Sequence, residues 1–224
     1  MEHKRLTLFA GHYGSGKTNI AVNYALHLAK TGKPVCIADL DIVNPYFRTK
    51  DSAKELEAAG VTLVSPQFAN SNVDLPALPA EAYRLVQDKS TYGIMDIGGD
   101  DRGAYALGRY VPAILEENDY RMVFVANCFR PLTPTAEDAL EIMREIEAAC
   151  GLKFTHIVNN SNLGTLTTPQ DVLDSVKFTE DLCRISGLPL WMHTAERSVA
   201  ATLTELPNVF SLQLQEKYFD LPMN

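Results

Sequence analysis

The chain has 224 residues, 46% of them hydrophobic, and a formal net charge of −8. This length and apolar content predict one domain over residues 1–224 with a sizeable core. The acidic balance argues against a non-specific nucleic-acid surface, which needs a basic face. The four cysteines are scattered without a C-x-x-C pair, which disfavours a zinc or iron–sulfur site. We expect no signal peptide and no transmembrane helix, and therefore a reduced, cytoplasmic protein.

The first predicted element is a strand over residues 6–10, followed by GHYGSGKT at 11–18. This is the G-x-x-x-x-G-K-[ST] pattern of a phosphate-binding loop, in which glycines let backbone N–H groups form an anion cradle. A helix predicted over 19–30 points its amino end, and its dipole, at the phosphates. Lys17 is expected on the β- and γ-phosphates and Thr18 on Mg²⁺. The predicted nucleotide-binding residues of this stretch are Gly11, Gly14, Ser15, Gly16, Lys17, Thr18 and Asn19.

A second buried strand, 35–38, ends in two carboxylates, Asp39 and Asp41. Carboxylates are costly in a core, so the pair indicates either a cation site or a solvated turn, and its place after the phosphate loop favours the site. The loop 42–49 is either a turn whose aromatic residues pack down or a segment near the γ-phosphate. A helix over 51–59 and a strand over 61–64 follow. The irregular stretch 65–79 is a candidate nucleotide cover or partner surface.

After a helix predicted over 80–89, an apolar strand from residue 92 ends in Asp96 and is followed by a Gly-Gly turn. This is the form of a Walker B strand, in which Asp96 holds a Mg²⁺-bound water. Gly99 allows a backbone N–H to approach the terminal phosphate and the turn to rearrange after hydrolysis. A helix over 104–117 is predicted to break near Pro112.

The remaining pattern predicts strands over 122–126, 154–158 and 188–192, helices over 135–150 and 170–186, and one or two helices in the tail 195–224. Asn159 follows a late strand. It is either a turn residue or, as we favour, a contact to the edge of a nucleotide base, because an amide both donates and accepts hydrogen bonds.

Strands alternate with helices along the whole chain. This order predicts an α/β fold with three layers, a mostly parallel doubly wound sheet and the P-loop NTPase architecture. Ligands of such folds bind at the carboxyl ends of the strands. The phosphate loop, the two aspartate segments and Asn159 all fall at such ends, so we expect them to form one site.

Four segments in order, GHYGSGKT, DLDIVNP, YGIMDIGGD and HIVNN, resemble the MinD/ParA and CobQ/CobB group of P-loop ATPases over about residues 5 to 165. The resemblance implies ATP and Mg²⁺ as ligands. It implies Lys17 and Asp41 as catalytic residues, with Asp41 positioning the attacking water. It also implies a metal site formed by Thr18, Asp39 and Asp96, and ATP-dependent dimerisation, as in many members.

The chain departs from that group at His12, which stands where members that dimerise face to face usually carry a second lysine. It also lacks the paired cysteines of the iron-protein branch, the basic tail of the membrane-cycling branch and the basic face of the DNA-partitioning branch. We therefore expect no iron–sulfur cluster, no DNA binding and no membrane binding.

Three functions follow from these features. The leading hypothesis is a Mg²⁺-dependent ATPase that acts as a nucleotide-driven switch for an unidentified protein partner, with a homodimer as a candidate assembly. The first alternative is an ATP-dependent small-molecule kinase or ligase, similar to CobB or dethiobiotin-synthesis enzymes, with loops 44–49 and 65–79 forming the substrate pocket. The second is an accessory or assembly NTPase with little turnover.

Overall fold

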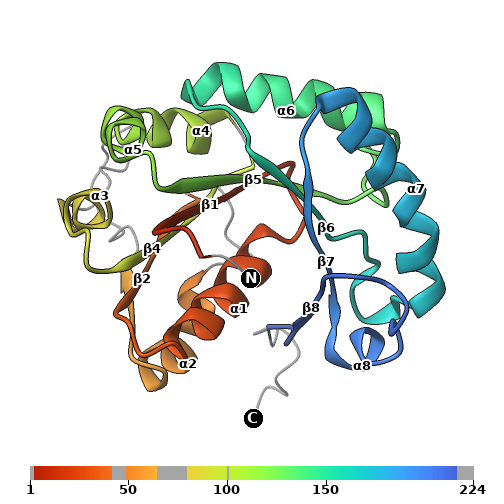
Figure 1. Ribbon diagram of the computed structural model, residues 1–224, viewed down its shortest axis with the longest axis horizontal. Helices are drawn as coiled ribbons and strands as arrows, with labels where there is room; N and C mark the ends of the chain where they lie inside the picture. The colour runs from red at the N-terminus through yellow and green to blue at the C-terminus, as the bar shows by residue number, and fades with distance from the viewer. Residues whose placement is uncertain (1–2, 42–48, 65–79, 100, 216–224) are drawn as a thin grey trace, which may run out of the picture.

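The computed structural model describes residues 3–41, 49–64, 80–99 and 101–215 (Figure 1). One eight-stranded sheet runs through this part of the chain in the order β3-β2-β4-β1-β5-β6-β7-β8, and every neighbouring pair is parallel. The predicted α/β doubly wound fold is confirmed. The strands are β1 Leu6–Ala10, β2 Val35–Leu40, β3 Val61–Val64, β4 Tyr92–Ile97, β5 Tyr120–Ala126, β6 His156–Asn159, β7 Leu190–Glu196 and β8 Val209–Leu212.

Helices cover both faces of the sheet, so the strands are buried on both sides (Figure 1). One face packs against α1 Lys17–Ala29 and α2 Ala53–Ala58. The other face packs against α3 Arg84–Gln87, α4 Asp101–Gly108, α5 Val111–Glu117, α6 Ala136–Cys150 and α7 Pro169–Ser186. The short helix α8 Arg197–Ala200 follows β7.

The alternation of side chains along β1 divides the interior into two cores. Leu6, Leu8 and Ala10 pack with the α4–α6 side, whereas Phe9 packs with α1, and all four are fully buried. This double burial explains why four of the five residues of β1, all except Thr7, are apolar. It also places the carboxyl end of β1 between two helical layers, where the phosphate loop begins.

The long helices begin and end where their sequence predicts. Thr135 and Thr168 each accept a hydrogen bond from the backbone of the fourth residue of their motif, forming capping boxes at the amino ends of α6 and α7. Gly151 and Gly187 end these two helices in the left-handed conformation. The predicted break near Pro112 is confirmed, since that residue lies in the first turn of α5.

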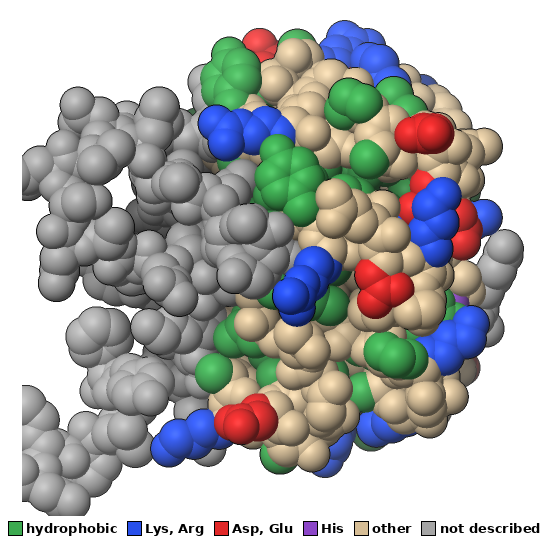
Figure 2. All heavy atoms as spheres, turned by 90° about the vertical axis from the view of Figure 1, so that its left-hand side faces the viewer, with side chains coloured by type: hydrophobic (Ala, Val, Ile, Leu, Met, Phe, Trp, Pro, Cys, Tyr) green, Lys and Arg blue, Asp and Glu red, His purple; other side chains and the backbone are tan. Residues whose placement is uncertain are grey.

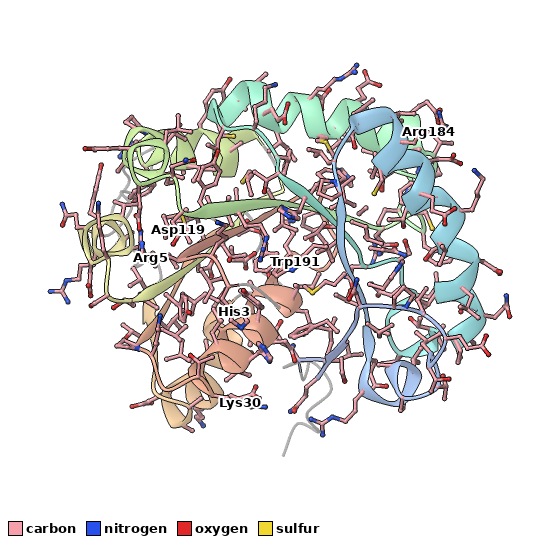
Figure 3. All side chains as sticks on the ribbon, viewed as in Figure 1. His3, Arg5, Lys30, Asp119, Arg184 and Trp191 are labelled. Atoms are coloured by element: carbon pink, nitrogen blue, oxygen red, sulfur yellow. The ribbon has the colours of Figure 1, made fainter. Side chains whose placement is uncertain are left out.

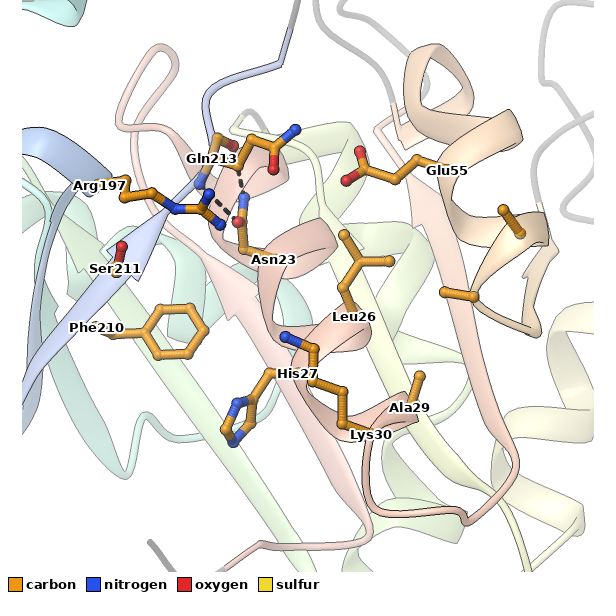
Figure 4. A pocket seen from close by; sticks show the side chains of 12 residues that line it. Asn23, Leu26, His27, Ala29, Lys30, Glu55, Arg197, Phe210, Ser211 and Gln213 are labelled. Carbon is orange, nitrogen blue, oxygen red and sulfur yellow. Dashed lines mark hydrogen bonds between the residues drawn. The ribbon is translucent and has the colours of Figure 1, made fainter.

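Two predicted segments differ from the structure. The helix predicted over 80–89 is a 3₁₀ turn, Ala80–Tyr83, followed by the single turn α3. The tail contains β8, a strand that the sequence did not predict. Asn23 of α1 holds the chain just after β8, donating to the Gln213 carbonyl at 2.9 Å and accepting from the Gln213 N–H at 2.8 Å (Figure 4). An amide on a helix therefore secures the edge of the sheet.

At the amino end of β1, Arg5 is a buried charge with a complete set of partners. Its guanidinium pairs with Glu117 through two nitrogens, and Nη1 donates to the Leu85, Asp88 and Thr91 carbonyls at 2.8, 3.3 and 3.2 Å. Its backbone N–H donates to Asp119, which lies beside it in Figure 3. This arrangement joins β1 to the segments around α3 and α5.

Candidate functional site

The phosphate loop connects the end of β1 to the start of α1. Gly16 precedes α1 with φ of 92°, in the left-handed region, and no side chain caps the first turn of the helix. A Cβ at Gly16 would collide with the Asn160 amide nitrogen, so both the conformation and the space require glycine. The uncapped backbone N–H groups of this turn are donors suited to an anion.

Lys17 folds back over the loop. Its side chain is 5% exposed, and Nζ donates to the His12 carbonyl at 3.2 Å. The Gly99 turn lies against the same atoms, because a Cβ at Gly99 would sit 2.7 Å from the Tyr13 nitrogen and 3.0 Å from Lys17 Nζ. The predicted Gly-Gly turn after β4 is therefore in direct contact with the phosphate loop.

Three carboxylates end the two strands on one side of β1. Asp39 and Asp96 are register partners on the adjacent strands β2 and β4. Asp41 follows β2, and its backbone N–H donates to Asp39 Oδ1 at 3.0 Å. All three are almost fully buried, at 2%, 0% and 5% exposure for Asp39, Asp96 and Asp41. The structure thus brings the two predicted aspartate segments to the loop.

The Asp96 carboxyl is the most strongly perturbed of these groups. Burial raises its pKa to about 6, helped by the negative charge of Asp41, whereas Thr18, the Lys17 charge and Thr49 act in the opposite direction. Oδ2 accepts a hydrogen bond from Thr49 Oγ1 at 3.1 Å. Oδ1 is buried with no hydrogen-bond partner among the described residues. A buried acceptor left in this state is suited to a ligand that brings donors or charge.

The oxygen atoms around the loop fit Mg²⁺. Besides Asp96 Oδ1, the Ser15 hydroxyl oxygen is buried without a hydrogen-bond partner in the described part of the chain. Within that part, no three His, Cys, Asp or Glu side chains form a cluster that could hold a metal. Mg²⁺ does not need one, because it usually binds through one or two carboxylates together with waters and substrate phosphates. Thr18 and Asp96 are the side chains that would hold it.

The side chain of Asn159 is hydrogen-bonded within the core, which disfavours the base contact that the sequence predicts for it. Its side chain is 1% exposed, donates to Ser175 Oγ at 2.8 Å and lies 3.1 Å from His193 Nδ1. Its Oδ1 accepts the Ser161 N–H at 3.1 Å. These partners use the whole amide within the core, where it joins β6 to α7 and β7.

The adjacent Asn160 supports the loop instead, a role the sequence did not predict. Its Nδ2 donates to the Ser15 carbonyl at 2.6 Å, and its Oδ1 accepts from Thr194 Oγ1 at 2.6 Å. The Asn-Asn pair at 159–160 is a signal for two amides, but the sequence does not say which one turns toward the loop. Thr49 was also not predicted as a single residue, although it lies in the candidate loop 42–49, of which 42–48 fall outside the described residues.

His12, a residue of the phosphate loop, lies in surroundings that disfavour its charged form. Burial lowers the pKa of its imidazole, and the positive charges of Lys17 and Arg130 lower it further, against a smaller effect of Glu145. The charged form of this imidazole is therefore disfavoured beside Lys17 and Arg130.

A separate groove of about 540 Å³ lies on the outer side of α1, between α2 and β8. Figure 4 shows His27, Lys30 and Phe210 among its lining residues, none of which belongs to the phosphate loop.

The face in Figure 2 carries basic and acidic side chains interspersed with hydrophobic ones over its described residues. No helix in the described part of the chain has the length and apolarity needed to cross a membrane.

No protein family model and no curated protein matches the sequence. Solved structures do match the fold. The cell division protein FtsY of Thermotoga maritima is 18% identical with a TM-score of 0.58, over 88% of this chain and 64% of that one. Chloroplast FtsY of Physcomitrella patens is 16% identical with a TM-score of 0.56, over 86% and 59%.

The signal recognition particle 54 kDa protein of Aeropyrum pernix K1, solved in complex with GDP, is 17% identical with a TM-score of 0.50. It matches over 84% of this chain and 40% of its own length. The chain thus spans less than two thirds of each of these proteins. At these identities the likeness concerns architecture alone, and it confirms the predicted P-loop NTPase fold.

Proposed function

We propose that this chain binds a nucleoside triphosphate with Mg²⁺ at residues 11–18 and hydrolyses it as a conformational switch. The observation that carries the proposal is the convergence of Lys17, at the start of α1, with Asp41 and Asp96, from the ends of β2 and β4, at a glycine loop with uncapped N–H groups. Buried acids beside a buried lysine are costly to a fold, and such perturbed groups cluster at functional sites.

Each residue of this cluster has a role in the proposed reaction. The backbone N–H groups of residues 14–18 hold the phosphates, and Lys17 neutralises the charge on the β–γ bridge. Thr18 and Asp96 would hold Mg²⁺, which when bound would supply positive charge to the phosphates. Asp39 holds the backbone of Asp41 in place, and Asp41 orients the attacking water. The Gly99 N–H contacts the γ-phosphate, and the turn that contains Gly99 rearranges when this phosphate is released.

We propose ATP as the nucleotide and the MinD/ParA type as the closest functional class, because four motifs resemble that group in order. The fold likeness to proteins solved with GDP makes GTP the competing ligand. Hydrolysis changes the conformation of the Gly99 turn, and a partner protein recognises this change. We further propose that residues 1–224 act as one nucleotide-binding domain and that nucleotide controls any self-association.

The test is phosphate release from ATP and from GTP, with Mg²⁺, by the full chain and by matched lysine variants. Lys17→Ala should lower turnover by about a hundredfold or more, because it removes a charge from the transition state. Lys153→Ala is the control, since that side chain is 81% exposed and far from the loop in sequence. Equal turnover of the two variants would refute the site.

Asp41→Ala separates chemistry from binding. The variant should slow hydrolysis by about tenfold or more while it binds nucleotide nearly as well as the wild type, because orienting a water contributes to the reaction step. Equal loss of binding and hydrolysis would contradict this role. Turnover that appears only with a small-molecule acceptor would instead support the kinase or ligase alternative.

A further inference from the structure

Arg130 lies against the phosphate loop although no motif of the sequence includes it. A Cβ placed on Gly14 would sit 3.5 Å from Arg130 Nε, 3.6 Å from Cζ and 3.8 Å from Cδ. The guanidinium is therefore packed on the middle of the loop. Its charge also reaches His12, where it helps to lower the pKa of the imidazole.

Within the described part of the chain, the Arg130 guanidinium lacks partners that an arginine with a structural role has. Arg130 Nε is buried and has no hydrogen-bond partner among the described residues. Those residues also place no carboxylate in an ion pair with it. A buried N–H of a charged group without an acceptor costs free energy, which is recovered when an anion binds.

The segment that carries Arg130 is held firmly. The Asn127 carbonyl accepts from Thr133 Oγ1 at 2.8 Å and from the Arg130 N–H at 3.3 Å. The Thr133 N–H donates to the Arg130 carbonyl at 3.0 Å, and Ser161 Oγ accepts the Cys128 N–H at 3.1 Å. The turn between β5 and α6 thus fixes the backbone of Arg130 beside the loop, which is what a preorganised ligand contact requires.

We propose that Arg130 is a second phosphate-binding cation of the site, beside Lys17. Arginine suits this role because its planar guanidinium pairs with phosphate oxygens through two parallel hydrogen bonds. The inference rests on the proposed nucleotide function and extends it to a residue 112 positions beyond Thr18 in the sequence. It assigns Arg130 to the polyphosphate of the nucleotide rather than to its base.

The experiment measures the affinity of nucleoside mono-, di- and triphosphates, with adenine and with guanine, in the presence of Mg²⁺. It compares the wild type with Arg130→Ala, Arg130→Lys and the control Arg144→Ala, an exposed arginine on α6. Arg130→Ala should weaken triphosphate binding by about ten- to a hundredfold, the effect of one charged hydrogen-bonding partner, and monophosphate binding much less. Arg130→Lys should restore part of the loss.

The melting temperature of the nucleotide-free protein distinguishes this role from a structural one. Arg130→Ala should leave it unchanged or raise it, because the variant removes a half-buried cation whose Nε is buried without a hydrogen-bond partner among the described residues. A lower melting temperature, with equal loss for all three phosphate lengths, would show that Arg130 only supports the loop and would overturn the inference. Triphosphate binding equal to that of Arg144→Ala would overturn it as well. A wild-type protein that binds no nucleotide would refute the proposed function itself.

Discussion

Two arginines lie near opposite ends of the central strands, and the protein treats them differently. Arg5 precedes β1 and is paired with Glu117 and with three backbone carbonyls. Arg130 follows β5, the neighbour of β1, and its buried Nε has no partner in the described part of the chain. The same side chain therefore completes the fold at one end of the sheet and is left available at the other.

The contrast extends to the groups around each arginine. Three buried side-chain atoms without a hydrogen-bond partner among the described residues, those of Ser15, Asp96 and Arg130, lie at the phosphate loop. Away from the loop, by contrast, the Arg121 guanidinium stacks on Trp191, with Cζ 4.2 Å from the ring centroid. Polar groups that gather at one place without partners indicate a ligand, whereas isolated ones do not.

The largest expected effect is on the amino end of the sheet. Arg5→Met should destabilise the protein by about 3–5 kcal/mol, because it leaves the Glu117 carboxylate, whose side chain is only 10% exposed, and three carbonyls without their donor. Urea unfolding would measure this loss. Nucleotide affinity in the absence of urea should remain that of the wild type. A loss of stability below about 1 kcal/mol would mean that the interactions of Arg5 contribute little to the stability of the fold.

The next effect is the pH dependence of stability set by Asp96. Its folded-state pKa of about 6 lies above the ordinary value of 3.8, so its protonated form favours folding. That contribution is present below pH 4 and is lost as pH rises through 6, a change of up to about 3 kcal/mol. Asp96→Asn should remove it, and the variant should be more stable than the wild type at pH 8.

This comparison uses unfolding midpoints of nucleotide-free protein in EDTA at pH 4, 6 and 8. The difference between variant and wild type isolates Asp96 from the other acids. A difference that does not change with pH would show that the carboxyl titrates normally. Added Mg²⁺ and nucleotide should reverse the order at pH 8, because they stabilise the charged form.

A smaller effect should separate the two adjacent asparagines. Asn160→Ala should cost about 1–3 kcal/mol and also weaken nucleotide binding, because the Ser15 carbonyl loses its donor. Asn159→Ala should cost a similar amount, since Ser175 and His193 lose their partner, but should leave nucleotide affinity unchanged. Urea unfolding and nucleotide titration would measure both. Equal loss of affinity in the two variants would contradict the assignment.

The smallest effect is expected at an exposed arginine. Arg184 lies at the outer side of α7 (Figure 3) and pairs with Asp181 at 3.1 Å, with 69% of its side chain exposed. Water and salt screen such pairs. Arg184→Ala should therefore leave both the unfolding midpoint and the nucleotide affinity at wild-type values. A clear shift in either quantity would mean that exposed arginines cannot serve as references for Arg5 and Arg130.

The sequence predicted the helices and strands that have a regular apolar periodicity and clear signals at their ends. The strands at 6–10 and 61–64 and the helices at 135–150 and 170–186 agree with the structure to within one residue, because their apolar periodicity and end signals are continuous. β8 was missed because it has four residues, two of them half-buried, and is secured by Asn23 from a distant helix. The single turn of α3 ends before Asp88, whose carboxylate accepts hydrogen bonds from the Ser90 N–H and from Thr91 Oγ1 in the loop that follows.

The candidate site divides in the same way. The glycine loop, Asp39, Asp41 and Asp96 follow motifs, so their meeting at one end of the sheet was predictable. Arg130 meets Gly14 across a long stretch of chain and belongs to no motif. Neighbouring residues at a strand end turn to different sides, so the sequence alone could not assign the loop contact to Asn160 rather than to Asn159.

The most direct test of the proposed nucleotide site is the melting temperature of the full chain with Mg²⁺ and saturating ATP or GTP. A ligand at a hundred times its Kd stabilises the folded state by about 2.7 kcal/mol, which corresponds to a shift of a few degrees. We expect one of the two nucleotides to raise the melting temperature of the wild type and of Lys153→Ala, but not of Lys17→Ala. No shift of the wild type with either nucleotide, or an equal shift in Lys17→Ala, would contradict the site.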